Sequence, residues 1–401
     1  MPVFLMVALA GSTLGFAFAA VSTYDFVAHL DRQVHGLHCS FLPGMGTPDV
    51  SGASGCHLTL MSPYSSVLRD SLWGGIPISL PAMAVFAFLG FWGAFLWFTR
   101  RIEDPTATAF YALASLVPAL TSLVMAIISV RELSAFCKLC VGIYVSSLLC
   151  FAGAAGLWRS AERAVLRFER DPLSMGALAI AFLTGCVFVG SSVVAYAASS
   201  PSFDKYVGKC GSLLKPQDAQ RVLLTLGSQA GSVDVVEVLD PLCPACRGFE
   251  RRFEKLSQAE HARRRALLFP LDNQCNWMVD SAVHPGACAI SEAMLCAGDD
   301  AEDVLSWAFE EQENIVAAER AKTGSAARLA SVRFPQFASC IGSSKAKARL
   351  NRALRWAVDN QVPVLTPQLY VNGTRLCDAD TDLGLDYMLS RLLEKTAGKA
   401  P

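Results

Sequence analysis

The sequence predicts a bundle of membrane-spanning helices followed by a soluble α/β domain. Hydrophobic residues make up 53% of the 401 residues and charged residues only 17%, whereas about a quarter of residues are charged in ordinary soluble proteins. The charges are sparse before position 200 and dense after it. Five apolar stretches before position 200 are each long enough to cross a bilayer as a helix, which takes roughly 20 residues.

These five stretches lie at about 2–21, 76–98, 106–130, 137–158 and 175–198. The first has an alternative interpretation as a cleaved signal peptide, since Ala17, Ala19 and Ala20 supply small residues for cleavage. No Lys or Arg precedes this apolar run, so the usual basic region is missing. We therefore favour a retained helix.

Lys and Arg residues in short loops predict the orientation in the membrane. They gather after the second stretch and between the fourth and fifth, which places these loops in the cytoplasm: Arg100, Arg101, Arg159, Arg163, Arg167 and Arg170. Segments 22–75 and 131–136, and everything after 198, then face the other side. All fourteen cysteines except Cys150 and Cys186 fall on that side or at its boundary. Such a distribution is typical of an oxidising compartment.

Beyond a mixed linker the pattern changes to that of a soluble α/β domain. A β-branched run at 233–239 predicts a buried strand. A turn at Asn372-Gly373 follows another short strand at 367–371. Further elements are expected as a strand at 266–271 and as helices at 216–226, 243–256, 291–358 and 382–395.

Cys243-Pro244-Ala245-Cys246 follows the first of these strands and opens a helix. The unpaired N–H groups and the dipole of a helix N-terminus stabilise a thiolate there. Cys246 comes one turn later and can resolve a mixed disulfide. The alternative is half of a zinc site, but none of the six histidines has ligand spacing to this pair. We favour redox chemistry and expect no metal.

Cys137-Lys138-Leu139-Cys140 begins the fourth apolar stretch at its predicted outer end. The spacing places both sulfurs on adjacent helical turns, close enough to bridge. A pair at this boundary can face water-borne thiols on one side and a lipid-soluble oxidant on the other. The alternative is a pair of unrelated, inert cysteines, since packed cysteines are common.

Residues 233–395 resemble the thioredoxin superfamily, and within it the DsbA-like oxidases that carry a helical insertion. Besides the cysteine pair, the resemblance depends on Thr366-Pro367 before an apolar strand and an Asn-Gly turn. It implies that Pro367 is cis, lies beside the active cysteines and shapes the edge where substrates dock.

Residues 1–157 resemble the vitamin K epoxide reductase family (VKOR). The resemblance rests on Cys137-x-x-Cys140-x-x-x-Tyr144 and on the outer-loop runs Cys56-His-Leu-Thr-Leu-Met-Ser62, Pro63-Tyr64-Ser65-Ser66 and Gly75-Ile76-Pro77-Ile78-Ser79. Bacterial members are often fused to a thioredoxin-like domain through an added fifth helix. The resemblance therefore implies a four-helix core at 1–158, a cytoplasmic loop, fifth helix and linker at 159–232, and an extracytoplasmic thioredoxin-like domain at 233–401.

The resemblance also implies the roles of the site residues. Cys137 and Cys140 would be the quinone-linked pair, with Cys140 nearer the quinone and Tyr144 beside the quinone pocket. Ser62 would support this site. Two loop cysteines, Cys39 and Cys56, would carry electrons to it from the catalytic pair Cys243 and Cys246. Sixteen residues separate Cys39 from Cys56, a longer spacing than the family leads us to expect.

The predicted function is that of a thiol–disulfide oxidoreductase in the bacterial cytoplasmic (inner) membrane, with its thioredoxin-like domain in the periplasm. It would oxidise reduced secreted or periplasmic proteins and pass the electrons to the quinone pool, as ubiquinone or menaquinone. An outward-directed reductase would use the same cysteines, so both directions stay open. A non-catalytic, membrane-anchored binding protein is a third alternative. The sequence has no basic stripe with interleaved aromatic residues, so it does not predict a nucleic-acid-binding surface.

Six further cysteines of the outer domain allow fifteen pairings. They are expected to form structural disulfides, and we favour pairs of Cys275 with Cys288 and of Cys296 with Cys340. No partner is predicted for Cys210 or for Cys377. Within the membrane, Cys150 and Cys186 are expected to be small packing residues.

Overall fold

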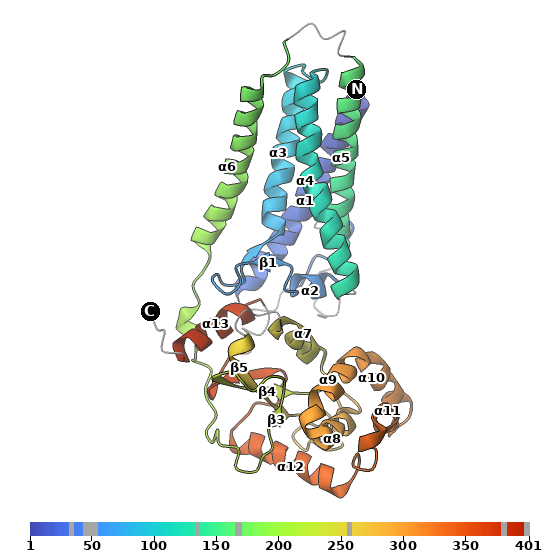
Figure 1. Cartoon of the computed structure of the whole chain (residues 1–401), viewed down its shortest axis with the longest axis vertical. Coiled ribbons are helices and arrows are strands. Elements are labelled where there is room, and N and C mark those ends of the chain that lie inside the picture. The colour runs from blue at the N-terminus through green and yellow to red at the C-terminus, as the bar shows by residue number, and fades with distance from the viewer. Residues whose placement is uncertain are drawn as a thin grey trace. The chain divides into compact units, whose positions relative to one another are not determined.

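The chain divides into a helical unit, Met1–Pro201, and an α/β unit, Ser202–Pro401, which confirms the predicted fold class (Figure 1). This computed structural model describes residues 1–31, 36–42, 55–133, 136–164, 171–254, 259–377 and 383–396. Arg167 and Arg170, and parts of the predicted outer segments 22–75 and 131–136, lie outside the described residues.

Five described helices of the first unit are long and apolar enough to cross a membrane: α1 (Pro2–Ala28), α3 (Ser79–Phe98), α4 (Pro105–Ile128), α5 (Lys138–Arg163) and α6 (Met175–Ser199). α1 packs against α5 and α3, and α4 packs against α5 and α3, so these four form the bundle seen in Figure 1. Large apolar side chains such as Phe91, Leu113 and Leu148 stay exposed on it. A surface of this kind suits contact with lipid chains, which are as apolar as leucine.

Glycines let α1 and α5 approach each other closely. A Cβ added to Gly11 would lie 2.5 Å from the backbone nitrogen of Cys150, and one on Gly153 would lie 2.5 Å from that of Ala8. Small residues at such crossings allow backbones to meet. The close packing holds the first half of α1 against the second half of α5.

α6 lies at the edge of the bundle, along α3 (Figure 1). Leu178 and Gly185 are its buried residues, and the ring of Phe88 packs against Gly185. This peripheral position fits a helix added to a four-helix core.

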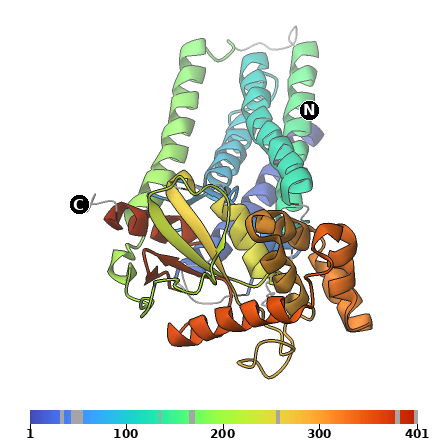
Figure 2. The same cartoon turned by 60° about the horizontal axis from the view of Figure 1, so that its bottom comes forward.

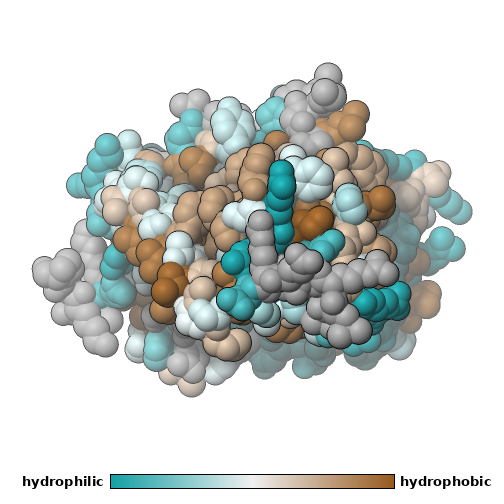
Figure 3. Space-filling view, turned by 90° about the horizontal axis from the view of Figure 1, so that it is seen from above, coloured by the Kyte–Doolittle hydropathy of each residue, from teal (hydrophilic) through white to brown (hydrophobic). Residues whose placement is uncertain are grey.

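Charged residues gather at the end of the bundle where α3 and α5 terminate. Arg100 and Arg101 follow α3, Arg163 ends α5, and Asp104 caps α4 and pairs with Arg101 at 2.8 Å. Figure 3 looks onto this end and shows hydrophilic groups among apolar ones. Cys137 lies at the opposite end of α5, about 39 Å away for a helix of 26 residues.

A five-stranded mixed sheet, in the order β3-β5-β4-β6-β7, forms the centre of the second unit. β4 (Val233–Leu239) pairs in parallel with β5 (Ala262–Leu268) and antiparallel with β6 (Gln368–Val371), while β3 (Leu224–Thr225) and β7 (Thr374–Arg375) complete the edges. One face packs on α12 (Ser344–Asp359), as Figure 2 shows. The opposite face packs on α7 (Pro244–Phe253) and α8 (Ala287–Ala297).

Helices fill the chain between β5 and β6, as the sequence predicts. Besides α8 and α12 they are α9 (Ala301–Glu310), α10 (Gln312–Ala321) and α11 (Ser325–Arg333). The closing helix, α13, spans Leu385–Thr396. The predicted strands at 233–239 and 367–371 are confirmed as β4 and β6.

Two predicted elements are wrong in extent or kind. β5 begins at Ala262, four residues before the predicted start, because Arg264 and Arg265 are strand residues whose charges pair with Glu237, Glu250 and Asp234. No helix forms at 216–226, where the Asp218 carboxylate accepts hydrogen bonds from the N–H groups of Val222 and Leu223 and makes a turn. The chain then enters β3, so residues 202–232 belong to the α/β unit.

Candidate functional site

The soluble cysteine pair lies where β4 gives way to α7. Cys243 is the N-cap residue of α7 and Cys246 follows in its first turn. Both are free thiols, 5% and 0% exposed. The Cys243 thiol donates a hydrogen bond to the Thr366 carbonyl, with sulfur and oxygen 3.6 Å apart. The Thr366–Pro367 peptide is cis, as the resemblance implies, and leads into β6.

The two thiols differ in their ionisation. A hydrogen bond from Cys246 lowers the pKa of Cys243 to about 6, against the effect of burial and with further help from the Thr366 side chain and the charge of His284. Burial and the neighbouring Cys243 raise the pKa of Cys246. Among the described residues, the buried Thr366 hydroxyl has no hydrogen-bond partner. At neutral pH the pair therefore offers one thiolate and one thiol.

A buried cluster of charges lies beneath this pair. Glu237 on β4 is 1% exposed and pairs with Arg264 at 3.0 Å, and Arg264 also binds Glu250 on α7 at 2.8 Å. Burial, with a contribution from Glu250, raises the pKa of Glu237 to about 8. Once it is ionised, Glu237 also raises the pKa of Cys246, so above about pH 8 this cluster helps to keep the second thiol protonated.

The membrane cysteine pair lies at the start of α5. Cys137 is the N-cap residue, and its sulfur accepts a hydrogen bond from the Cys140 backbone N–H at 3.2 Å. Cys137 and Cys140 form a disulfide, with Cα atoms 5.2 Å apart. Cys39 and Cys56 form a second disulfide in the loop before α3, with Cα atoms 5.8 Å apart. The unusual spacing of Cys39 and Cys56 is therefore compatible with a bond between them.

A cavity of about 350 Å³ opens beside the membrane pair. Its walls are largely apolar and come from α1, α3, α4 and α5. Residues of the proposed site line it together: Cys56, Ser62, Cys137, Cys140 and Tyr144. One member of the loop disulfide thus meets both members of the membrane disulfide at a single cavity.

The segment that carries Ser62 is fixed by a buried arginine. Arg69 is 7% exposed, and its guanidinium donates hydrogen bonds to the Ser62 carbonyl, to Ser65 Oγ at 2.8 Å and to Ser66 Oγ at 2.7 Å. The Ser62 hydroxyl itself donates to the Thr59 carbonyl at 2.7 Å. Sequence reasoning missed Arg69, because a single arginine in a loop carries no pattern that predicts burial.

Sequence reasoning also missed Asp25, which lines the cavity from the end of α1. It is 3% exposed and accepts hydrogen bonds from His38, which directly precedes Cys39. A carboxylate within an apolar helix could have indicated such a site. Because the predicted span ends at residue 21, Asp25 falls in the loop that follows it.

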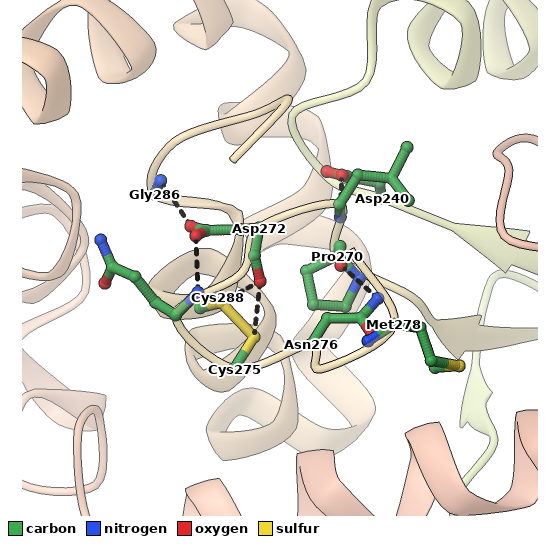
Figure 4. Close-up of a disulfide and its surroundings, with 10 residues drawn as sticks. Asp240, Pro270, Asp272, Cys275, Asn276, Met278, Gly286 and Cys288 are labelled. Carbon is green, nitrogen blue, oxygen red and sulfur yellow. Dashed lines mark hydrogen bonds between the residues drawn. A yellow bond between two sulfur atoms is a disulfide. The ribbon is translucent and has the colours of Figure 1, made fainter. Parts of the chain in front are cut away.

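The predicted pairs Cys275–Cys288 and Cys296–Cys340 are confirmed, and Cys210 bonds Cys377. Figure 4 shows the first of these beside Asp272. Cys150 is a free, buried packing residue of α5, as expected, whereas the expectation is wrong for Cys186, which is free and exposed because only Leu178 and Gly185 are the buried residues of α6. Across the residues that the structure describes, no three His, Cys, Asp or Glu side chains are grouped to hold a metal ion.

Known proteins resemble the two units separately. The profile of the vitamin K epoxide reductase family matches residues 6–155, and a thioredoxin profile matches residues 220–390. Among solved structures, oxidoreductase DsbA from Xylella fastidiosa is similar, with 20% identity over 43% of this chain and 90% of that chain and a TM-score of 0.28. No curated protein matches the chain.

The chain therefore joins a domain of the vitamin K epoxide reductase family to a thioredoxin-like domain. With its apolar helices and several cysteine pairs, this combination defines a membrane disulfide oxidoreductase. The vitamin K epoxide reductase family is in general linked to quinones.

Proposed function

We propose that this protein oxidises the thiols of secreted proteins and passes the electrons to a membrane quinone. The observation that carries the proposal is the single cavity that both Cys56 and the Cys137–Cys140 pair line. In this relay Cys243 and Cys246 accept electrons, the Cys39–Cys56 pair transfers them, and the Cys137–Cys140 pair delivers them.

The first step is thiol exchange at the soluble pair. A substrate thiolate attacks the oxidised pair at Cys243, forming a mixed disulfide and releasing the Cys246 thiolate, which takes up a proton. A second substrate thiolate then attacks the substrate sulfur, closes the substrate disulfide and releases Cys243. The low pKa of Cys243 makes it a good leaving group. Two electrons then reside on the reduced pair.

The reduced pair next attacks the Cys39–Cys56 disulfide, and the loop dithiol so formed attacks the Cys137–Cys140 disulfide. Each exchange breaks one S–S bond, forms another and moves two electrons. We assign Cys137 as the partner of the loop pair and Cys140 as the cysteine nearer the quinone. Ser62, on the segment that Arg69 anchors, supports the wall of this site.

The cavity suits a quinone ring. Its volume of about 350 Å³ is within the range of roughly 300–1,000 Å³ for small-molecule sites. A bound quinone would supply two-electron acceptor chemistry that side chains lack. Tyr144 lies one helical turn after Cys140 on the same wall and offers a hydroxyl that can bind a quinone carbonyl. Ubiquinone and menaquinone both present such carbonyls.

The low pKa of Cys243 favours oxidation of substrates over the reverse flow. A stabilised thiolate stabilises the reduced pair, and this makes the corresponding disulfide a stronger oxidant.

An outward-directed reductase remains the alternative that uses the same cysteines. In cells, an oxidase keeps Cys243 and Cys246 mainly oxidised, whereas a reductase keeps them mainly reduced. A non-catalytic binding protein would keep its activity after alkylation of both pairs.

We further propose a multi-pass protein of the bacterial cytoplasmic (inner) membrane with its α/β unit in the periplasm. The arginine-rich end of the bundle, and the Cys39–Cys56 disulfide at the opposite end, support this orientation. α1 lines the cavity through Asp25 and Phe26, which supports its retention. We keep 1–158 as the quinone-linked domain and extend the soluble domain from 233 back to 202, because β3 belongs to its sheet.

The test is quinone reduction by the purified full chain. We expect a reduced substrate protein and dithiothreitol both to drive the reaction. Cys140→Ala should abolish it with either donor. Cys243→Ala should abolish it with the protein donor and leave the dithiothreitol reaction, because a small dithiol can reduce the loop pair directly. An unchanged rate in Cys140→Ala would contradict the proposed terminal donor.

Trapping tests the transfer between the two units. Cys246→Ser removes the resolving thiol, so a mixed disulfide of Cys243 with a loop cysteine should accumulate and be identified by mass spectrometry. Its absence, in a variant that still forms mixed disulfides with substrate proteins, would contradict the route through Cys39 and Cys56.

A further inference from the structure

A loop closed by a disulfide lies next to the soluble pair, between β5 and α8. Cys275 and Cys288 close it, with Cα atoms 5.8 Å apart. Asp272, which is fully buried, accepts hydrogen bonds from the N–H groups of Gln274 at 3.1 Å and Gly286 at 2.9 Å. Figure 4 shows Asp272 reaching across the loop in this way. The loop is therefore held both by its disulfide and by an internal carboxylate.

Asp240 joins this loop to the turn that carries Cys243. It is fully buried, and its backbone carbonyl accepts the Cys243 N–H at 3.1 Å. Its carboxylate accepts hydrogen bonds from Leu242 N at 2.8 Å, Leu271 N at 2.7 Å and His284 Nδ1 at 2.7 Å. One buried carboxylate thus fixes both the cysteine turn and a histidine from a distant part of the chain.

The backbone of His284 is fixed as well. The N–H groups of Val283 and His284 both donate to the Leu271 carbonyl, at 2.9 and 3.1 Å. The His284 side chain is 15% exposed. Hydrogen bonds fix both the backbone and the ring of His284. The side chain therefore loses little conformational entropy when its imidazole interacts with a neighbouring group.

The groups around His284 favour its charged form. Burial lowers its pKa, but the hydrogen bond and charge of Asp240 and the charge of Cys243 outweigh burial, so the net pKa is raised. Arg320 on α10 opposes this shift. Glu319, also on α10 and close to Gly286, uses its two carboxylate oxygens to bind the N–H groups of Gly324 and Ala326.

We propose that His284 is a positioning residue for thiol exchange, whose imidazolium, held by Asp240 on the disulfide-closed loop, stabilises the thiolate of reduced Cys243. The two residues between Cys243 and Cys246 are Pro244 and Ala245, which carry no charge. The cation therefore comes from outside the motif. This inference rests on the proposed redox role of Cys243 and Cys246.

The consequence is a more oxidising centre. When two glutathione thiols reduce the Cys243–Cys246 disulfide, that S–S bond breaks and the one in oxidised glutathione forms. Two electrons move to the centre, Cys246 takes up one of the two glutathione protons, the other goes to solvent, and Cys243 stays a thiolate. A cation that favours this thiolate shifts the equilibrium toward the reduced centre.

The test uses the full chain with Cys39→Ser, Cys56→Ser, Cys137→Ala, Cys140→Ala and Cys186→Ala, so that the soluble pair is the exchanging dithiol and no exposed free thiol remains among the described residues. We would measure its equilibrium with glutathione and the titration of its thiolate by ultraviolet absorbance. His284→Gln should lower the equilibrium constant for glutathione oxidation about three- to tenfold, as expected for one partly buried charge. Tenfold corresponds to about 30 mV for two electrons. The thiolate titration should move to higher pH.

His261→Gln is the matched control, because His261 is exposed in the short turn of helix just before β5. It should change neither measurement. His284→Arg keeps a positive charge at every pH, so at alkaline pH, where the wild-type imidazolium is lost, its equilibrium constant for glutathione oxidation should stay above that of the wild type.

Equal equilibrium constants and titrations in wild type and His284→Gln would overturn the inference. If the Gln variant fails to fold, a pH profile of His284→Arg identical to that of wild type would overturn it instead. A wild-type pair that does not exchange with glutathione at all would contradict the proposed function rather than the role of His284.

Discussion

The Asp25 carboxylate binds His38 twice, accepting hydrogen bonds from the ring Nδ1 at 2.7 Å and from the backbone N–H at 2.9 Å. Because His38 directly precedes Cys39, this contact fastens the loop disulfide to the end of α1. Asp25 also lines the cavity beside Cys137 and Cys140. The contact therefore sets the position of the loop pair relative to the membrane pair.

Asp25→Asn should slow electron transfer from the loop pair to the membrane pair. Hydrogen bonds to a charged group contribute about 1.5–3 kcal/mol, so we expect a loss of about tenfold or more in the rate. Single-turnover quinone reduction after addition of dithiothreitol would measure it. Asp171→Asn, at the other end of the bundle, is the matched control and should keep the wild-type rate. A wild-type rate in Asp25→Asn would show that the loop does not need this anchor.

The reactivity of reduced Cys243 should follow its lowered pKa. Its rate of alkylation by iodoacetamide should be half-maximal near pH 6, because only the thiolate reacts. In Cys246→Ala the half-maximal point should move to higher pH, because the hydrogen bond that contributes most to the shift is lost. A wild-type half-maximal point at about 8.5, the value of an ordinary cysteine, would contradict this account.

Local patterns in the sequence predict most helices and strands. They do not predict side-chain contacts between residues that are distant in the sequence. The five spans, β4 and the two Cys-x-x-Cys pairs follow from hydrophobic runs and spacing. β5 was misjudged because Arg264 is buried only through its pairing with Glu237 and Glu250. Similarly, His284 gains its place only when folding brings Asp240 beside it. No spacing rule in one sequence connects these positions.

Glu237→Gln should change how stability depends on pH. Burial raises the pKa of Glu237 to about 8, so the native state holds a proton that the unfolded state, with a pKa near 4.3, has released. The stability contributed by this proton is complete below the unfolded pKa and is lost as pH rises through about 8.

Denaturation of the full chain, followed by fluorescence, would measure this effect. Wild-type stability should fall relative to Glu237→Gln between acidic pH and pH 8, by on the order of 1–3 kcal/mol. Glu302→Gln, at an exposed position on α9, should follow the wild-type profile. Parallel wild-type and Glu237→Gln curves would mean that Arg264 keeps Glu237 ionised throughout.

Removal of the Cys275–Cys288 disulfide should reveal whether the loop positions His284. Opening a loop of this length costs about 3 kcal/mol in the chain-entropy account, so the double serine variant should be less stable. The freed loop should also hold His284 less firmly against Asp240, so the equilibrium constant with glutathione should fall, though less than in His284→Gln.

Cys296→Ser with Cys340→Ser is the matched control, since that bond closes a longer loop within the helical insertion. It should reduce stability and leave the glutathione equilibrium unchanged. If both double variants shift the equilibrium equally, general loosening of the domain, rather than the position of His284, sets the redox balance.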